Sequence, residues 1–113
     1  MKKTLLVIFC LTASTLYAQT PTFDWAFGLG GNYYDKGIDV ATDSTGNVYA
    51  LGSFANTVDF DPGSNVLNLT SNNNSDDVYI AKYNAAKDLL WAHVFGGTGN
   101  ETPIAMALDA SGN

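Results

Sequence analysis

The chain repeats part of itself at a fixed offset. Residues 25–47 align with residues 91–113 without a gap, and nine of the 23 positions are identical. Both copies begin with WA, continue through GG and end in a similar pentapeptide, DSTGN in the first copy and DASGN in the second. A fixed period of 66 residues is typical of repeat architectures, in which each unit buries its apolar faces against its neighbours. We expect one full unit and the start of a second, and hence a fragment of a longer protein or a truncated gene product.

The unit predicts β-structure throughout. Four apolar runs rich in β-branched and aromatic residues are bounded by Gly, Asn, Asp or Ser, and none has a helical period. The predicted strands are 38–42, 48–54, 78–83 and 89–95. In two of them, 48–54 and 89–95, both faces are largely apolar, whereas a sheet with one wet face would alternate with polar residues. We therefore expect a sheet that is covered on both faces by copies of itself.

The repeated pentapeptide predicts the turn between the first two strands. The Asp43 carboxylate can accept backbone N–H groups two or more residues further on, and Gly46 can take the positive φ that a short hairpin loop needs. The alternative is that Asp43 and Asn47 are cation ligands.

A long insertion, residues 55–77, separates the second strand from the third. Its middle piece, VLNLTS, alternates and is expected to form an extra hairpin with residues 57–60. Insertions of this kind usually map to one rim of a repeat assembly, where ligands bind.

The insertion also holds the acidic residues that could bind calcium, which takes oxygen ligands. Asp59 and Asp61 are one group and Asp76 and Asp77 the other, although EF-hand spacing is absent. We assign no metal site and no cofactor, and keep calcium as an alternative. Asp59 and Asp61 also suggest a general acid–base pair, but the Pro and Gly that follow favour a strand end entering a turn.

Composition excludes several classes of partner. After removal of the first 18 residues, three lysines stand against 11 acidic residues, giving a formal charge of −8 with no arginine and no cysteine. Nucleic acid and anionic membranes need clustered Lys or Arg. No disulfide or thiolate metal site is available either.

Residues 1–18 have the layout of a secretory signal peptide: two lysines, a short apolar core and small or neutral residues before the expected cleavage after Ala18. The apolar stretch is too short to span a bilayer, which takes about 20 residues. We expect a secreted or cell-surface protein. A lipid anchor at Cys10 is the alternative, which Phe9 disfavours because that signal requires a small residue there.

The order of motifs resembles the bacterial β-propeller repeat family called SBBP. The motifs are W-A-x-x-F-G-G, I-A-x-D-x-x-G-N-V-Y-x-x-G-S-F, V-D-F-D-P-G, L-T-S-x-x-x-S-D-x-Y-I-A-K-Y and L-W-A, and they cover residues 24–113. The chain departs from the pattern at Leu29, where the second copy has Phe95, and at residues 84–87, which lack the turn glycine.

The resemblance implies an all-β fold: one four-stranded β-propeller blade plus parts of the neighbouring blades. Residues 24–29 are expected to be a lone fourth strand, which in a full ring would complete the last blade. It implies an exported surface protein of Bacteroidetes-like bacteria, and it supplies no catalytic residues. The expected partners are other blades of the same full-length chain.

The most favoured function is a non-catalytic binding or structural scaffold for a glycan or protein ligand. Tyr33 and Tyr34 suit sugar contacts, although packing at a blade edge is the simpler interpretation. One alternative is a propeller enzyme acting on polysaccharide, with His93 as the one histidine. The other is a calcium-stabilised adhesin segment.

Overall fold

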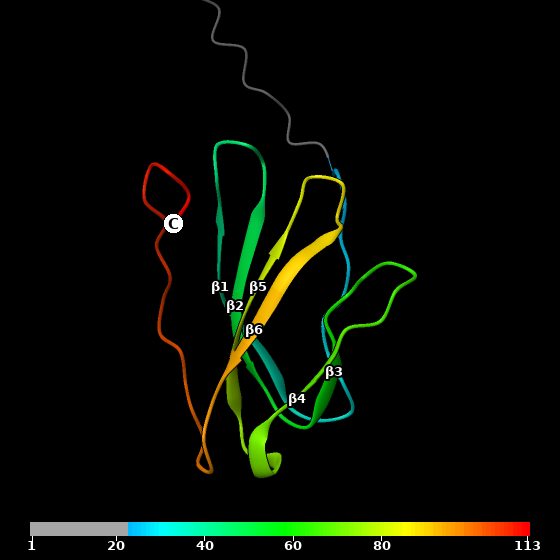
Figure 1. Ribbon diagram of the computed structural model, residues 1–113, viewed down its shortest axis with the longest axis vertical. Helices are drawn as coiled ribbons and strands as arrows, with labels where there is room; N and C mark the ends of the chain where they lie inside the picture. Colours follow the sequence, from blue (N-terminus) through cyan, green and yellow to red (C-terminus); the bar gives the residue numbers. More distant parts are fainter. Residues whose placement is uncertain (1–22) are drawn as a thin grey trace, which may run out of the picture.

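The computed structural model describes residues 23–113 and is all-β (Figure 1). The signal peptide predicted at residues 1–18 and its cleavage site lie outside the described residues. The strands and the single 3₁₀ turn are β1 (Asp35–Thr42), β2 (Val48–Phe54), β3 (Thr57–Asp59), β4 (Asn68–Thr70), η1 (Asn72–Asn74), β5 (Asp77–Tyr83) and β6 (Leu89–Phe95).

Four strands form one antiparallel sheet in the order β1-β2-β5-β6. All four predicted strands are therefore confirmed. β1 begins at Asp35, earlier than expected, because its polar start pairs with the end of β2, where Asp35 faces Phe54. An irregularity between Gly37 and Asp39 interrupts this pairing and re-aims the side chains that follow.

The predicted extra hairpin is also confirmed. β3 pairs with β4, and the hydroxyls of Thr57 and Thr70 lie 2.7 Å apart across it. Val58 and Phe60 are almost completely buried, at 2% and 0% exposed. The hairpin therefore folds its apolar side chains back onto the large sheet rather than projecting into solvent.

The core lies between this hairpin and one face of the sheet. Aromatic rings meet edge to face there, with centroids 5.3 Å apart for Phe54 and Phe60 and 5.0 Å apart for Phe60 and Tyr79, a preferred geometry for aromatic pairs. The Tyr83 hydroxyl donates to the Phe60 carbonyl oxygen at 2.9 Å. The buried cluster consists of Phe54, Val58, Phe60, Tyr79, Ala81 and Tyr83.

The turn between β1 and β2 has the predicted geometry. Asp43 Oδ1 accepts the backbone N–H groups of Thr45 and Asn47, both at 3.0 Å, and Gly46 has φ 83°. The Asn47 amide donates to Asp43 Oδ2 at 2.7 Å. These bonds fix the conformation of the turn, so the pentapeptide has a structural role.

The same loop occurs between β5 and β6 with acid and amide exchanged. Asn84 Oδ1 accepts the N–H groups of Ala86 and Asp88, both at 2.9 Å, and the Asn84 amide donates to Asp88 Oδ2 at 2.9 Å. Lys87, with φ 75°, takes the place of the glycine. The missing glycine therefore changes the strain of the loop but not its shape.

The prediction of a strand at residues 24–29 is wrong. Within residues 23–113 this segment has no hydrogen-bonded strand partner and forms no strand. A β-strand is stabilised by its ladder partner, and a counterpart to β5 that would pair with this segment lies nowhere in the described residues. The segment is held instead by its side chains.

Candidate functional site

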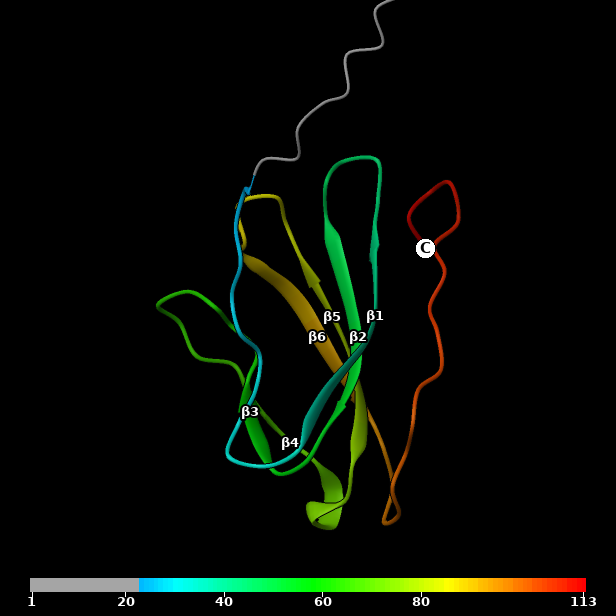
Figure 2. The same cartoon turned by 180° about the vertical axis from the view of Figure 1, so that it is seen from behind.

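Two flanking segments cover the two faces of the large sheet (Figures 1 and 2). Residues 25–31 run along one face and residues 101–113 along the other. The alternation of β2 agrees: Val48 and Ala50 adjoin the first segment, whereas Tyr49, on the opposite face, adjoins the second. Each face of the sheet is therefore partly covered, one by the chain that precedes it and the other by the chain that follows it.

The preceding segment packs through aromatic rings. Trp25 stacks on Phe27 with centroids 5.4 Å apart, and Phe27 meets Tyr83 at 4.9 Å. In the repeat alignment Trp25 corresponds to Trp91, so this segment is the counterpart of β6. The first face of the sheet thus receives the equivalent of a last strand.

The following segment is attached by polar contacts. The Met106 N–H donates to Asp39 Oδ2 at 2.9 Å, and the Tyr49 hydroxyl donates to the Gly112 carbonyl oxygen at 2.9 Å. Met106 and Gly112 correspond to Val40 of β1 and to Gly46 of the first turn. The second face thus receives the equivalent of a first strand and its turn.

The turn of the second copy repeats the geometry of the first. Asp109 Oδ1 accepts the N–H groups of Ser111 and Asn113 at 2.8 and 2.9 Å, and Gly112 has φ 80°. Because both turns have the same bonds, the repeated pentapeptide folds in the same way in both copies.

A charged and aromatic cluster lies beneath this second turn. The Lys82 ammonium is 3.7 Å from Asp43 Oδ2 and 4.7 Å from the centroid of the Tyr49 ring, and Trp91 meets Tyr49 edge to face at 6.0 Å. The Asn47 amide and the other donors of the loop hold the pKa of Asp43 well below its ordinary value. Asp43 is therefore the charged partner of Lys82 as well as the loop acceptor.

The acidic residues of the insertion bind backbone rather than one another. Asp59 Oδ1 accepts the N–H groups of Asp61 and Leu67 at 3.0 and 2.9 Å, and Asp61 Oδ1 accepts that of Gly63 at 2.7 Å. These bonds close the β3–β4 loop, which is sufficient to explain Asp59 and Asp61 without an acid–base role.

The second acidic pair has two different environments. Asp77 is 0% exposed and accepts the Asn72 N–H at 2.8 Å and the Ser75 hydroxyl at 3.2 Å, whereas the Asp76 carbonyl oxygen accepts the Glu101 N–H at 2.7 Å. In the part of the chain from residue 23 onward, no three His, Cys, Asp or Glu side chains come together as a group that could hold a metal ion.

The other residues singled out by sequence lie on the surface. Tyr33 and Tyr34 are 62% and 84% exposed. His93 is exposed on β6, with its ring 5.1 Å from that of Trp91. The structure therefore leaves the two tyrosines available to a ligand. Among residues 23–113, His93 forms no hydrogen bond with the carboxylates of the insertion.

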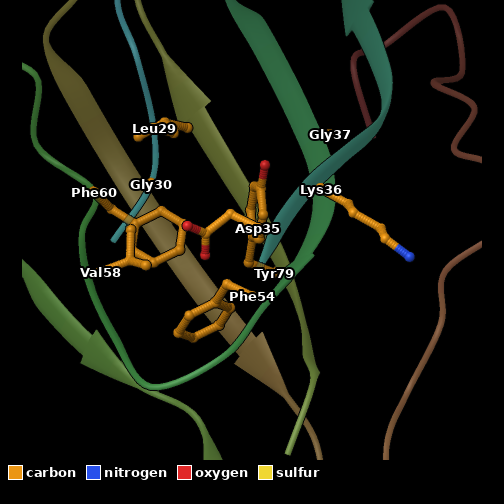
Figure 3. A pocket seen from close by; sticks show the side chains of 9 residues that line it. All are labelled: Leu29, Gly30, Asp35, Lys36, Gly37, Phe54, Val58, Phe60 and Tyr79. Carbon is orange, nitrogen blue, oxygen red and sulfur yellow. The ribbon is translucent and has the colours of Figure 1, made fainter. Parts of the chain in front are cut away.

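Sequence reasoning missed the role of Asp35. Asp35 Oδ2 accepts the Gly31 N–H at 2.7 Å, and in the second copy Glu101 Oε2 accepts the Gly97 N–H at 3.2 Å. The signal was an acidic residue four positions after the GG pair in both copies, which a search for identities overlooks because one is Asp and the other Glu. The other oxygen, Asp35 Oδ1, is buried without a hydrogen-bond partner and faces a small pocket (Figure 3).

No family model, no curated protein and no solved structure matches the chain. Residues 23–113 contain no helix with the length and apolarity needed to cross a bilayer.

Proposed function

We propose that the chain is a blade-forming repeat of an exported β-propeller of the SBBP type, acting as a non-catalytic scaffold that presents loops to a glycan or protein. The observation that carries the proposal is the enclosure of the sheet between a β6 counterpart, residues 25–29, and a β1 counterpart, residues 104–108. Stacked copies of one unit would make the same two contacts at every junction.

Exposed apolar side chains support further stacking. In the chain alone Val40 is 61% exposed, Leu90 49%, Phe95 55% and Ile104 90%. A neighbouring unit would cover these side chains, and burying apolar surface contributes about 25 cal/mol per Å². A propeller of about 4–8 such blades also leaves only short, protected sheet edges, which limits aggregation.

The loops at one end of the sheet supply a ligand-binding rim in this proposal. η1 lies at that end with the loop of residues 30–34, opposite the β1–β2 and β5–β6 turns (Figure 1). The Asn72 amide donates to the Gly96 carbonyl oxygen at 3.2 Å, and Asn100 Oδ1 accepts the Asp76 N–H at 3.1 Å. Because residues 96–100 are the repeat counterpart of 30–34, the rim would alternate insertion loops with GG loops.

Tandem arrays of residues 35–100 test the stacking, with chemical unfolding as the readout. If the units stack, stability rises with copy number because each copy adds an interface, and it rises sharply at the number that closes the ring. An unfolding midpoint that stays constant with copy number would contradict the proposal.

Val40→Lys is the matched control. The side chain is mostly exposed in the single chain, so the substitution should leave the single unit nearly unchanged, within about 0.5 kcal/mol. In the array the substitution places a charge between stacked sheets, so the stability should no longer rise with copy number.

A further inference from the structure

A small pocket opens beside the start of β1 and contains the orphaned carboxylate oxygen. Its volume is about 50 Å³, several times the ~10–15 Å³ that one water molecule needs. Asp35 Oδ1 is buried there with no hydrogen-bond partner, while Oδ2 is occupied by the Gly31 N–H at 2.7 Å. A buried charged atom without a partner is strongly unfavourable. A ligand that donates a hydrogen bond to this oxygen would therefore stabilise the folded chain.

The pocket has an exposed rim and a buried floor. Gly30, Lys36 and Gly37 at the rim are exposed, whereas Phe54 and Phe60 at the floor are 1% and 0% exposed. Figure 3 shows the Asp35 carboxylate pointing over the floor rings while the Lys36 side chain extends away from it. The nearby lysine therefore does not neutralise the carboxylate, and the open rim gives a ligand access.

The floor is aromatic on several sides. The rings of Phe54, Phe60 and Tyr79 meet one another edge to face, with centroids 5.0–6.1 Å apart. No hydrogen bond involves the Tyr79 hydroxyl among residues 23–113. Burial raises the pKa of Tyr79, and the negative charge of Asp35 raises it further, so the tyrosine remains a neutral hydroxyl beside the carboxylate.

The lining selects the chemistry of the ligand. A calcium ion takes 6–8 oxygen ligands, and the side chains of the pocket offer oxygens from Asp35 and Tyr79 only. A cation that donates N–H bonds to one carboxylate and lies against aromatic rings fits this lining better. The small volume excludes a bulky head group.

We propose that this pocket, formed by Asp35, Phe54, Phe60 and Tyr79 under the rim of β1, binds a primary ammonium group that donates to Asp35 Oδ1. The group comes from a free alkylamine or from a lysine side chain of a protein partner. The site belongs to the single unit and does not depend on the formation of a ring.

The test uses the chain after signal removal and methylammonium chloride as the probe. Potassium chloride and tetramethylammonium chloride at equal ionic strength are the controls. Neither cation has an N–H donor, and tetramethylammonium is in addition too bulky for the pocket. We expect a saturable rise in Tm with methylammonium alone, since a ligand that binds the folded state stabilises it. In the NMR spectrum the amide of Gly31 should shift with the same saturation curve.

Asp35→Asn is the matched variant, because it keeps an oxygen for the Gly31 N–H and places its own NH₂ where the ammonium would lie. It should lose the saturable response. Tyr34→Phe, at a side chain that is 84% exposed and does not line the pocket, is the folded control and should retain the full response. If the asparagine variant does not fold, the saturable shift of the Gly31 amide in the unmodified chain decides the test.

Nα-acetyl-lysine amide distinguishes the two sources. A response equal to that of methylammonium supports a lysine side chain, and a response to methylammonium alone supports a free amine. Equal responses to potassium and methylammonium, or none to either cation in the unmodified chain, would overturn the proposal and leave the pocket as the site of a water molecule.

Discussion

Replacing Tyr83 with phenylalanine removes one buried hydrogen bond and almost no volume. Tyr83 and Phe60 are both 0% exposed, and the Tyr83 hydroxyl donates to the Phe60 carbonyl oxygen at 2.9 Å. In the variant this carbonyl loses its hydroxyl donor in a site without solvent. Leaving a buried acceptor unsatisfied costs about 1–3 kcal/mol.

The assay is urea unfolding followed by tryptophan fluorescence, with thermal unfolding as a second readout. For a domain of this size each kcal/mol corresponds to about 4–8 °C in Tm. The matched control is Tyr34→Phe, at a side chain that is 84% exposed, which should change stability by less than about 0.5 kcal/mol.

The pH dependence provides a signature that packing alone would not produce. Burial, then the neighbouring Tyr79, raises the pKa of Tyr83 far above its ordinary value of 10.0. The stabilisation that the Tyr83 hydroxyl gives the folded state is therefore complete below the ordinary pKa of tyrosine, and it is lost as the pH rises through the folded-state pKa. The difference in the free energy of unfolding between the original chain and Tyr83→Phe should therefore become smaller above about pH 10. Equal stability of Tyr83→Phe and Tyr34→Phe at pH 7 would refute the reasoning.

Three further predictions concern turns and a close approach. Gly46→Ala should destabilise the chain by about 1 kcal/mol because φ is 83° there, whereas Lys87→Gly, at φ 75°, should be neutral or stabilising; both are measured by urea unfolding. The Asn47 amide lowers the pKa of Asp43, so the stabilisation from Asp43 is complete above its ordinary pKa and is lost as pH falls below it. Asp43→Asn should weaken this acid dependence, and adding Asn47→Asp should restore the loop. Gly52→Ala should abolish cooperative thermal unfolding, because a Cβ there collides with the β1 backbone.

Local pattern was sufficient to predict the strands and the first turn. Apolar runs bounded by turn residues located β2, β5 and β6, and the repeated pentapeptide located the loop at residues 43–47. The signal was local in each case, because strand alternation and Asx turns depend on residues only a few positions apart.

Other features required the three-dimensional arrangement. The Asn84 loop was missed because acid and amide are exchanged relative to Asp43. Asp35 was missed because its counterpart in the second copy is Glu101, so the two positions are not identical. Asp59 and Asp61 were considered as ligands because sequence does not show which backbone amides a carboxylate will accept.

The enclosure of the sheet by the two flanking segments is tested most directly by nuclear Overhauser contacts in the isotope-labelled chain. The account predicts contacts between the rings of Phe27 and Tyr83, whose centroids are 4.9 Å apart, on one face. On the other face it predicts contacts between Tyr49 and Gly112, joined by a 2.9 Å hydrogen bond. Both sets should persist at high dilution. The account would be contradicted if the two flanking segments showed no contacts with the sheet and had the NMR relaxation of an unstructured chain.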